Sequence, residues 1–236
     1  MIRQIVLTAL VAGGLAGIVA FGGHTLKAVP LIAQAEVYEK AAPTAAPAPA
    51  GPTQAAAPAH THEHAEWEPE DGLERTLYTL LADLVAGIGF AFVLVGAIQL
   101  RGRTVDTVQG VLWGIAGFAA FSAAPALGLP PELPGMAGEG LVQRQIWWLA
   151  TAFATAGGLG LLAFAPALAL KIAGLVLMLT PHVVGAPIQH AEAGPLPAAL
   201  AAEFAAVSLV TALIFWAALG GLTGFFWSRF ARPAAA

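Results

Sequence analysis

Long apolar runs separated by short polar segments make up most of the chain. Six runs are long enough to cross about 30 Å of hydrocarbon as helices that rise about 1.5 Å per residue. They lie near residues 4–26, 77–100, 105–127, 145–165, 167–187 and 198–227. This pattern predicts an all-α fold: a polytopic transmembrane helical bundle of six spans, in which residues 1–236 form a single integral membrane domain with one long external loop.

The fourth and fifth runs almost touch, because only Ala165-Pro166-Ala167 separates them. Pro166 and the following Lys171 favour a tight turn between two helices. A single kinked or re-entrant element at this point would reduce the count, so five spans is the main alternative.

The first apolar run begins at Ile5, after a short basic start, and continues to about Leu26. The apolar region of a signal peptide is shorter, at about 7–15 residues. We therefore expect an uncleaved first span, and a signal peptide is the alternative.

The composition supports a membrane protein. Hydrophobic residues make up 58% of the chain and charged residues only 10%, whereas soluble domains have about 25% charged residues. The chain has no cysteine, which excludes disulfides, thiolate metal sites, iron–sulfur clusters and cysteine nucleophiles.

The positions of the charges give an independent test of the span count. Basic residues should concentrate in the short cytoplasmic loops. With six spans and a cytoplasmic N-terminus, the inner segments carry one acid, Asp106, and these basic residues: Arg3, Arg101, Arg103, Lys171, Arg229 and Arg232. Removing one span would place the last two outside, so the charges favour six. We expect a multi-pass protein of the cell inner membrane, with both termini cytoplasmic and the His-bearing loop periplasmic or external.

Small residues at helical spacing predict how the spans pack. Gly13/Gly17, Gly110/Gly114 and Gly220/Gly224 each form a small-xxx-small pair, which lets two helix backbones approach closely. Trp147, Trp148 and Trp227 lie near span ends, where tryptophan commonly anchors a helix at the membrane interface.

The external loop between the first two spans has three parts. Residues 31–40 favour a helix, and Pro30 is expected to kink it away from the first span. Residues 41–59 are mainly Ala and Pro, a composition typical of an extended tether. Residues 60–76 are acidic and carry histidines, so the region 41–76 combines a Pro/Ala tether with a His/acidic loop.

His60, His62 and His64 are the most distinctive local feature of this loop. Alternate spacing lets an extended segment point three imidazoles the same way, and neutral imidazole binds Zn, Ni, Cu and Co. Nearby glutamates add negative potential that would concentrate cations. We predict capture of a divalent metal, and a solvated linker that merely contains histidines is the alternative.

Four more polar residues lie in the outer half of the spans: His24, Asp83, His182 and Glu203. An ionisable side chain within the bilayer usually faces a partner or a cavity. If their helices converge, these residues form a mixed N/O site that suits a divalent transition metal. The alternative is that Asp83 and Glu203 are capped by neighbours or hydrated near the headgroups.

The sequence lacks the motifs of the common catalytic classes. It contains no P-loop, no G-x-S-x-G elbow and no H-E-x-x-H helix. We expect no enzyme activity, no organic cofactor and no nucleic-acid partner.

Five segments, in order along nearly the whole chain, resemble the family of CbtA-type predicted cobalt transporter subunits. They are VPLIAQAEVYE (29–39), EWEPEDGLER (66–75), LPPELPG (129–135), RQIWW (144–148) and PHVVGAP (181–187). The family is described with about five spans, while six are counted here.

This resemblance implies cobalt uptake together with a small one-span partner subunit that carries a His-rich end. A His/carboxylate site would by itself bind Ni and Cu more strongly than Co, so selectivity must come from geometry, metal availability or the partner. The leading hypothesis is a membrane subunit for divalent metal uptake. The alternative is a metal-capturing or assembly subunit that does not conduct, and assembly into a homo-oligomer is left open.

Overall fold

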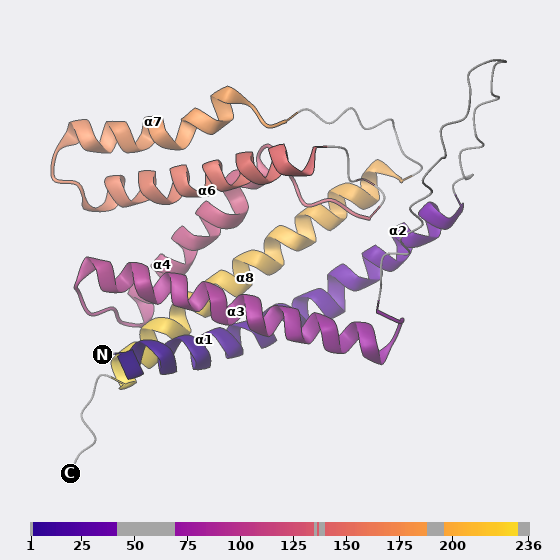
Figure 1. The fold of residues 1–236 in the computed structure, drawn as a ribbon, viewed down its shortest axis with the longest axis horizontal. Coiled ribbons are helices and arrows are strands. Elements are labelled where there is room, and N and C mark those ends of the chain that lie inside the picture. The colour runs from indigo at the N-terminus through magenta and orange to yellow at the C-terminus, as the bar shows by residue number, and fades with distance from the viewer. Residues whose placement is uncertain (1, 42–68, 135, 137–139, 188–195, 231–236) are drawn as a thin grey trace, which may run out of the picture.

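The structure is helical throughout the part of the chain that it describes. The computed structural model describes residues 2–41, 69–134, 136, 140–187 and 196–230 (Figure 1). Its elements, where η marks a π-helical segment, are α1 (Ile2–Gly23), η1 (His24–Ala28), α2 (Val29–Ala41), α3 (Leu73–Arg101), α4 (Thr107–Phe118), η2 (Ala119–Ala123), α5 (Ala124–Ala126), α6 (Leu141–Phe164), α7 (Leu168–Val184) and α8 (Ala198–Phe230). The described residues contain no strand, which confirms the all-α prediction.

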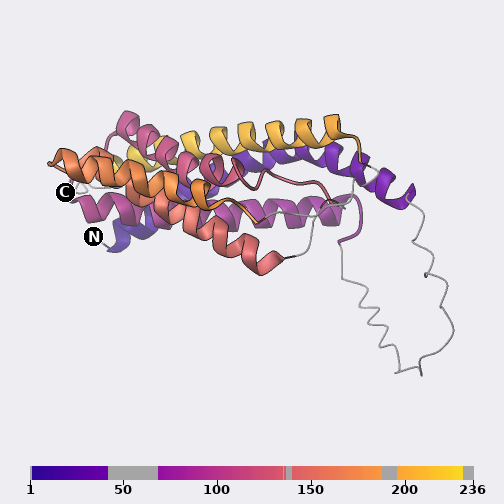
Figure 2. The same ribbon diagram turned by 90° about the horizontal axis from the view of Figure 1, so that it is seen from above.

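These elements form six rods, because α1, η1 and α2 run on as one helix and α4, η2 and α5 as another. Consecutive rods run in opposite directions (Figure 1), and the view from above shows them lying along a common long axis (Figure 2). The side-chain amide of Gln4 donates to the carbonyl oxygen of Trp227, 3.0 Å away. The start of α1 and the end of α8 therefore meet at one end of the bundle.

Five rods are long and apolar enough to cross a membrane, and α7 is shorter, with 17 residues. At 1.5 Å per residue, α7 is roughly 25 Å long. Pro166 lies in a turn between the extended residues Ala165 and Ala167. The segment is thus an antiparallel pair of helices and not one kinked element. The six-span and five-span counts differ only in whether α7 crosses the bilayer.

Glycine contacts bring α1 and α3 together. A Cβ atom at Gly17 would lie 2.6 Å from the carbonyl oxygen of Asp83, and one at Gly13 would lie 2.6 Å from Cα of Ile88. Real Cβ atoms do not approach other atoms so closely. In lipid, where helices gain no hydrophobic drive to associate, such close packing is a main source of attraction.

Close glycine contacts also join α4 to α8 and α6 to α7. Gly110 and Gly114 of α4 face Gly220 and Gly224 of α8, and Gly158 of α6 faces Gly174 of α7. A Cβ at Gly220 would lie 2.7 Å from the backbone nitrogen of Gly114. The small-xxx-small pairs expected from the sequence therefore lie in the packing faces.

Both π-helical segments lie just before a proline. In each, a backbone N–H bonds five residues back: Val29 donates to His24, and Ala124 donates to Ala119. Pro30 and Pro125 follow directly. A proline ring clashes with the carbonyl four residues earlier and has no N–H to offer it. The wider π turn accommodates that loss, so the chain passes Pro30 as a continuous helix with a local π turn.

Two of the three tryptophans expected at the membrane interface are buried against neighbouring helices. Trp147 and Trp227 are each only 7% exposed. Trp216 lies in an aromatic cluster with Phe90 and Phe121, at ring-centroid distances of 4.9 and 5.6 Å. This cluster ties α3, η2 and α8 together in the middle of the bundle.

The glycine contacts predict a position-specific effect of one methyl group. Gly17→Ala places a Cβ against the backbone of Asp83 and forces α1 away from α3. We expect destabilisation of about 1–3 kcal/mol, the usual size for overpacking, measured as a lower midpoint of thermal unfolding in detergent. Gly14→Ala is the matched control, because nothing lies within 4 Å of a Cβ at Gly14. Equal midpoints for the two variants would contradict this packing.

Candidate metal site

His24 and Asp83 form a hydrogen-bonded pair between the first rod and α3. Nδ1 of His24 lies 3.0 Å from each carboxylate oxygen of Asp83. The Asp83 side chain is 12% exposed and the His24 side chain 39%. A carboxylate inside a membrane helix is costly unless it has a partner, and the imidazole is that partner. The structure thus brings together two of the four in-span candidates.

Local structure explains why these two residues meet. Asp83 is ten residues after the start of α3, or roughly 15 Å along its axis. Gly17 packs on the carbonyl of Asp83, so the backbones of α1 and α3 are in close contact at Asp83. His24 is the first residue of η1, and the preceding Gly23 packs on the side chain of Thr211 in α8. Three rods therefore meet around the pair.

His182 lies in a different environment, near the end of α7. Its ring contacts the indole of Trp147 edge to face, with ring centroids 5.9 Å apart. The indole N–H of Trp147 donates to the carbonyl oxygen of Pro181, 3.1 Å away. His182 is therefore held against α6 within the α6–α7 hairpin.

Glu203 is exposed on the second turn of α8. The described residues contain no group of three or more His, Asp, Glu or Cys side chains that could hold a metal ion. The expected convergence of His24, Asp83, His182 and Glu203 in one site thus does not occur within the described part of one chain. Counting residues gives the depth of a side chain along its helix, but the direction in which it points depends on packing.

The external histidines His60, His62 and His64 lie outside the described residues. Their proposed role in metal capture therefore stays a prediction from the sequence.

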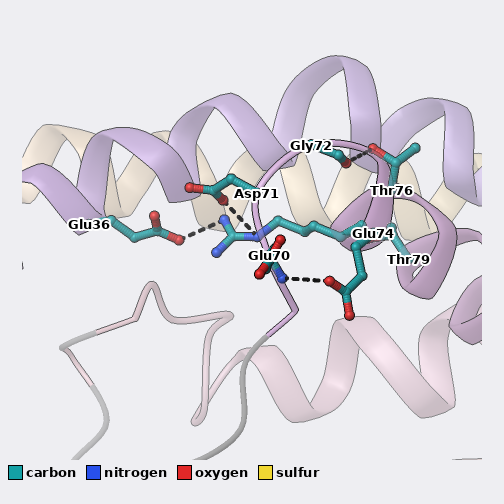
Figure 3. Close-up of polar contacts among 8 residues, drawn as sticks. Glu36, Glu70, Asp71, Gly72, Glu74, Thr76 and Thr79 are labelled. Carbon is teal, nitrogen blue, oxygen red and sulfur yellow. Dashed lines mark hydrogen bonds and ion pairs between the residues drawn. The ribbon is translucent and has the colours of Figure 1, made fainter.

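Sequence reasoning missed an arginine clasp at the ends of the tether region. The guanidinium of Arg75 pairs with Glu36 of α2 at 2.8 Å and with Asp71 at 3.2 Å (Figure 3). The clasp joins the last turns of α2 to the first turn of α3, on either side of residues 42–68. Glu36 and Arg75 both lie in acidic external segments, but they are 39 positions apart in the sequence, which hid the contact.

A second ion pair and a cavity also lie outside the predicted set. Arg144 at the start of α6 bonds to Glu132 in the preceding loop. A half-open cavity of about 250 Å³ lies between η2, α5, α6 and α8. Its lining is mostly apolar, with two hydroxyl groups from Ser122 and Ser208. None of the candidate metal ligands lines this cavity.

Comparison of the chain with curated proteins and with solved structures gave no match. Comparison with protein families gave one that agrees with the bundle and with the segments noted in the sequence. Its model matches residues 2–228, nearly the whole chain. The chain therefore belongs to the family described as probable cobalt transporter subunit, CbtA.

Proposed function

We propose that this chain is the membrane subunit through which a divalent transition metal, cobalt, enters the cell. The observation that carries the proposal is the half-buried His24–Asp83 pair inside the helical bundle. An imidazole beside a carboxylate offers nitrogen and negative charge to a dication. With neutral imidazole, the pair carries one net negative charge, which offsets part of the cost of placing the ion in low dielectric.

The external loop supplies the capture step of the proposal. His60, His62 and His64, with the acidic residues around them, gather the ion outside the membrane. His182 and Glu203 serve as separate contacts on the same side, because neither touches the His24–Asp83 pair. The membrane potential then favours inward movement by roughly 2.3 kcal/mol per charge per 100 mV.

The orientation follows from the basic residues at one end of the bundle. Arg3, Arg101, Arg103, Lys171 and Arg229 are all exposed near the end where α1 begins and α8 ends. By the positive-inside rule, that end faces the cytoplasm and the tether region faces outward. As part of the proposal, a small one-span His-rich subunit assembles with the chain in the inner membrane.

A second candidate function has one observation in its favour. The described residues bring only two candidate ligands together, fewer than the four to six positions that a divalent transition metal usually fills. The chain could then be a non-conducting metal-capturing or assembly subunit. Reconstitution in vesicles separates the two functions. The chain is reconstituted with the small partner subunit, from which the histidines have been removed. If the chain itself conducts, these vesicles still take up ⁵⁷Co, and if it only captures metal or assists assembly, they do not.

Substitution of the pair should abolish uptake. In cells that depend on this system, we expect His24→Gln or Asp83→Ala to lower the initial rate of ⁵⁷Co uptake at least tenfold, because the ion loses its binding site inside the bundle. Asp106→Asn is the matched control: it removes an exposed carboxylate at the other end of the bundle, where Asn caps α4 as well as Asp does, and it should leave uptake unchanged. Normal uptake by both pair variants, with normal amounts of protein in the membrane, would contradict the proposed route.

Deletion of residues 60–64 tests the capture step. A collector raises the local metal concentration, so its loss should matter only when the metal is scarce. We expect uptake to fall severalfold at nanomolar cobalt and to recover at micromolar cobalt. Replacing the three histidines with glutamine in a chain of unchanged length controls for the shortened loop. Loss of uptake that is equal at all concentrations would argue against capture.

The proposed orientation can be tested with cysteine labelling, since the chain has no cysteine of its own. Thr76→Cys at the start of α3 should react with a membrane-impermeant maleimide in intact spheroplasts. Ser228→Cys at the end of α8 should react only after the membrane is opened. The opposite pattern would invert the proposed direction.

A further inference from the structure

The hydrogen bond between His24 and Asp83 determines which ring nitrogen of His24 is free. A carboxylate only accepts hydrogen bonds, so the nitrogen that faces it must carry the hydrogen. Nδ1 faces both oxygens of Asp83 at 3.0 Å. Neutral His24 is therefore the Nδ1–H tautomer, and its lone pair is on Nε2. No hydrogen bond or ion pair joins Nε2 to a described residue.

Exposure indicates which part of the pair an incoming ion meets. The Asp83 side chain is about three times less exposed than that of His24, at 12% against 39%. Both carboxylate oxygens also face the same N–H, at equal distances. The imidazole therefore occupies the position between the two carboxylate oxygens, where a metal ion bound by both oxygens would have to lie.

We propose that Nε2 of His24 is the atom that binds the metal and that Asp83 is a positioning residue that does not touch it. This assignment rests on the proposed function and divides the roles within its site. Metal-bound histidines usually donate their other ring N–H to a carboxylate or a carbonyl, which fixes the tautomer, orients the ring and raises its basicity. The ligand class is a first-row divalent cation that keeps water on its other positions.

The backbone around the pair fits this division. Gly17 packs directly on the carbonyl of Asp83, which fixes the height of α3 beside α1. Gly23 packs on Thr211 of α8 and holds the chain immediately before His24. The imidazole is thus oriented by Asp83 of α3, and the backbone just before it is held by α8.

The first test uses NMR to determine which ring nitrogen of His24 carries the hydrogen in the absence of metal. The full chain, labelled with ¹⁵N-histidine in lipid nanodiscs, should give a His24 signal, assigned by its loss in His24→Gln, with Nδ1 protonated and Nε2 bare. Asp83→Asn should keep that pattern, because the amide oxygen still accepts the hydrogen bond. Asp83→Ala should shift it toward Nε2–H. A wild-type His24 with its hydrogen on Nε2 would overturn the assignment.

The second test measures binding of Co²⁺ alone by calorimetry, in chains whose His60, His62 and His64 are replaced by glutamine so that the proposed capture histidines do not contribute. Loss of an orienting partner of a metal ligand typically costs about 10–100-fold in affinity. We expect a dissociation constant raised up to 100-fold in Asp83→Ala and clearly less in Asp83→Asn. His24→Gln should remove the site, and Asp106→Asn should have no effect. Equal, complete loss in both Asp83 variants would make Asp83 a direct ligand and overturn the proposal.

The two tests also separate this assignment from the proposed function. If His24 has the Nδ1–H tautomer but the chain without the loop histidines binds no Co²⁺, then metal uptake through the pair is wrong and so is Nε2 as a metal ligand, while Asp83 still positions the ring. If Co²⁺ binds but the tautomer is reversed, uptake stands and the division of roles falls.

Discussion

Close backbone contact at glycine is the constraint on which this structure depends. Lipid tails are as apolar as the helix surfaces, so burial of Leu or Val cannot hold the spans together. The attraction must come from contacts at short range, and side chains larger than hydrogen would prevent them at Gly17, Gly110 or Gly174. The same contacts hold the polar residues in place. The His24–Asp83 pair exists because Gly17 brings the two helices together next to it.

Two prolines change the helical hydrogen bonding within the rods, whereas the glycines determine how the rods pack against one another. At Pro30 and at Pro125, the helix loses a backbone hydrogen bond, a loss that costs most where no water can replace it. A π turn precedes each proline, so both rods stay continuous. One of these turns begins with His24, and π turns inside helices occur frequently at functional sites. The π turn that keeps the helix continuous before Pro30 thus also positions the imidazole of His24.

Much of the fold could be predicted from the sequence, because it depends on properties that are local along the chain. Apolar run length located all six rods, and the spacing of Gly13 and Gly17 identified a packing face. The site depended on rotation about each helix axis, which counting residues does not give. Trp147 packs inward and Glu203 points outward for that reason. The contact of Arg75 with Glu36 spans 39 residues and had no local signal.

The hairpin of α6 and α7 is joined to the remaining rods differently from the way those rods join one another. Its link runs through side-chain tips: Phe164 stacks on Trp113 and lies under Arg101, and Trp148 contacts Phe121. The 250 Å³ cavity opens beside the second of these contacts. None of these contacts involves His24 or Asp83. The packing of the hairpin on the other four rods is therefore separate from the packing that sets the distance between His24 and Asp83.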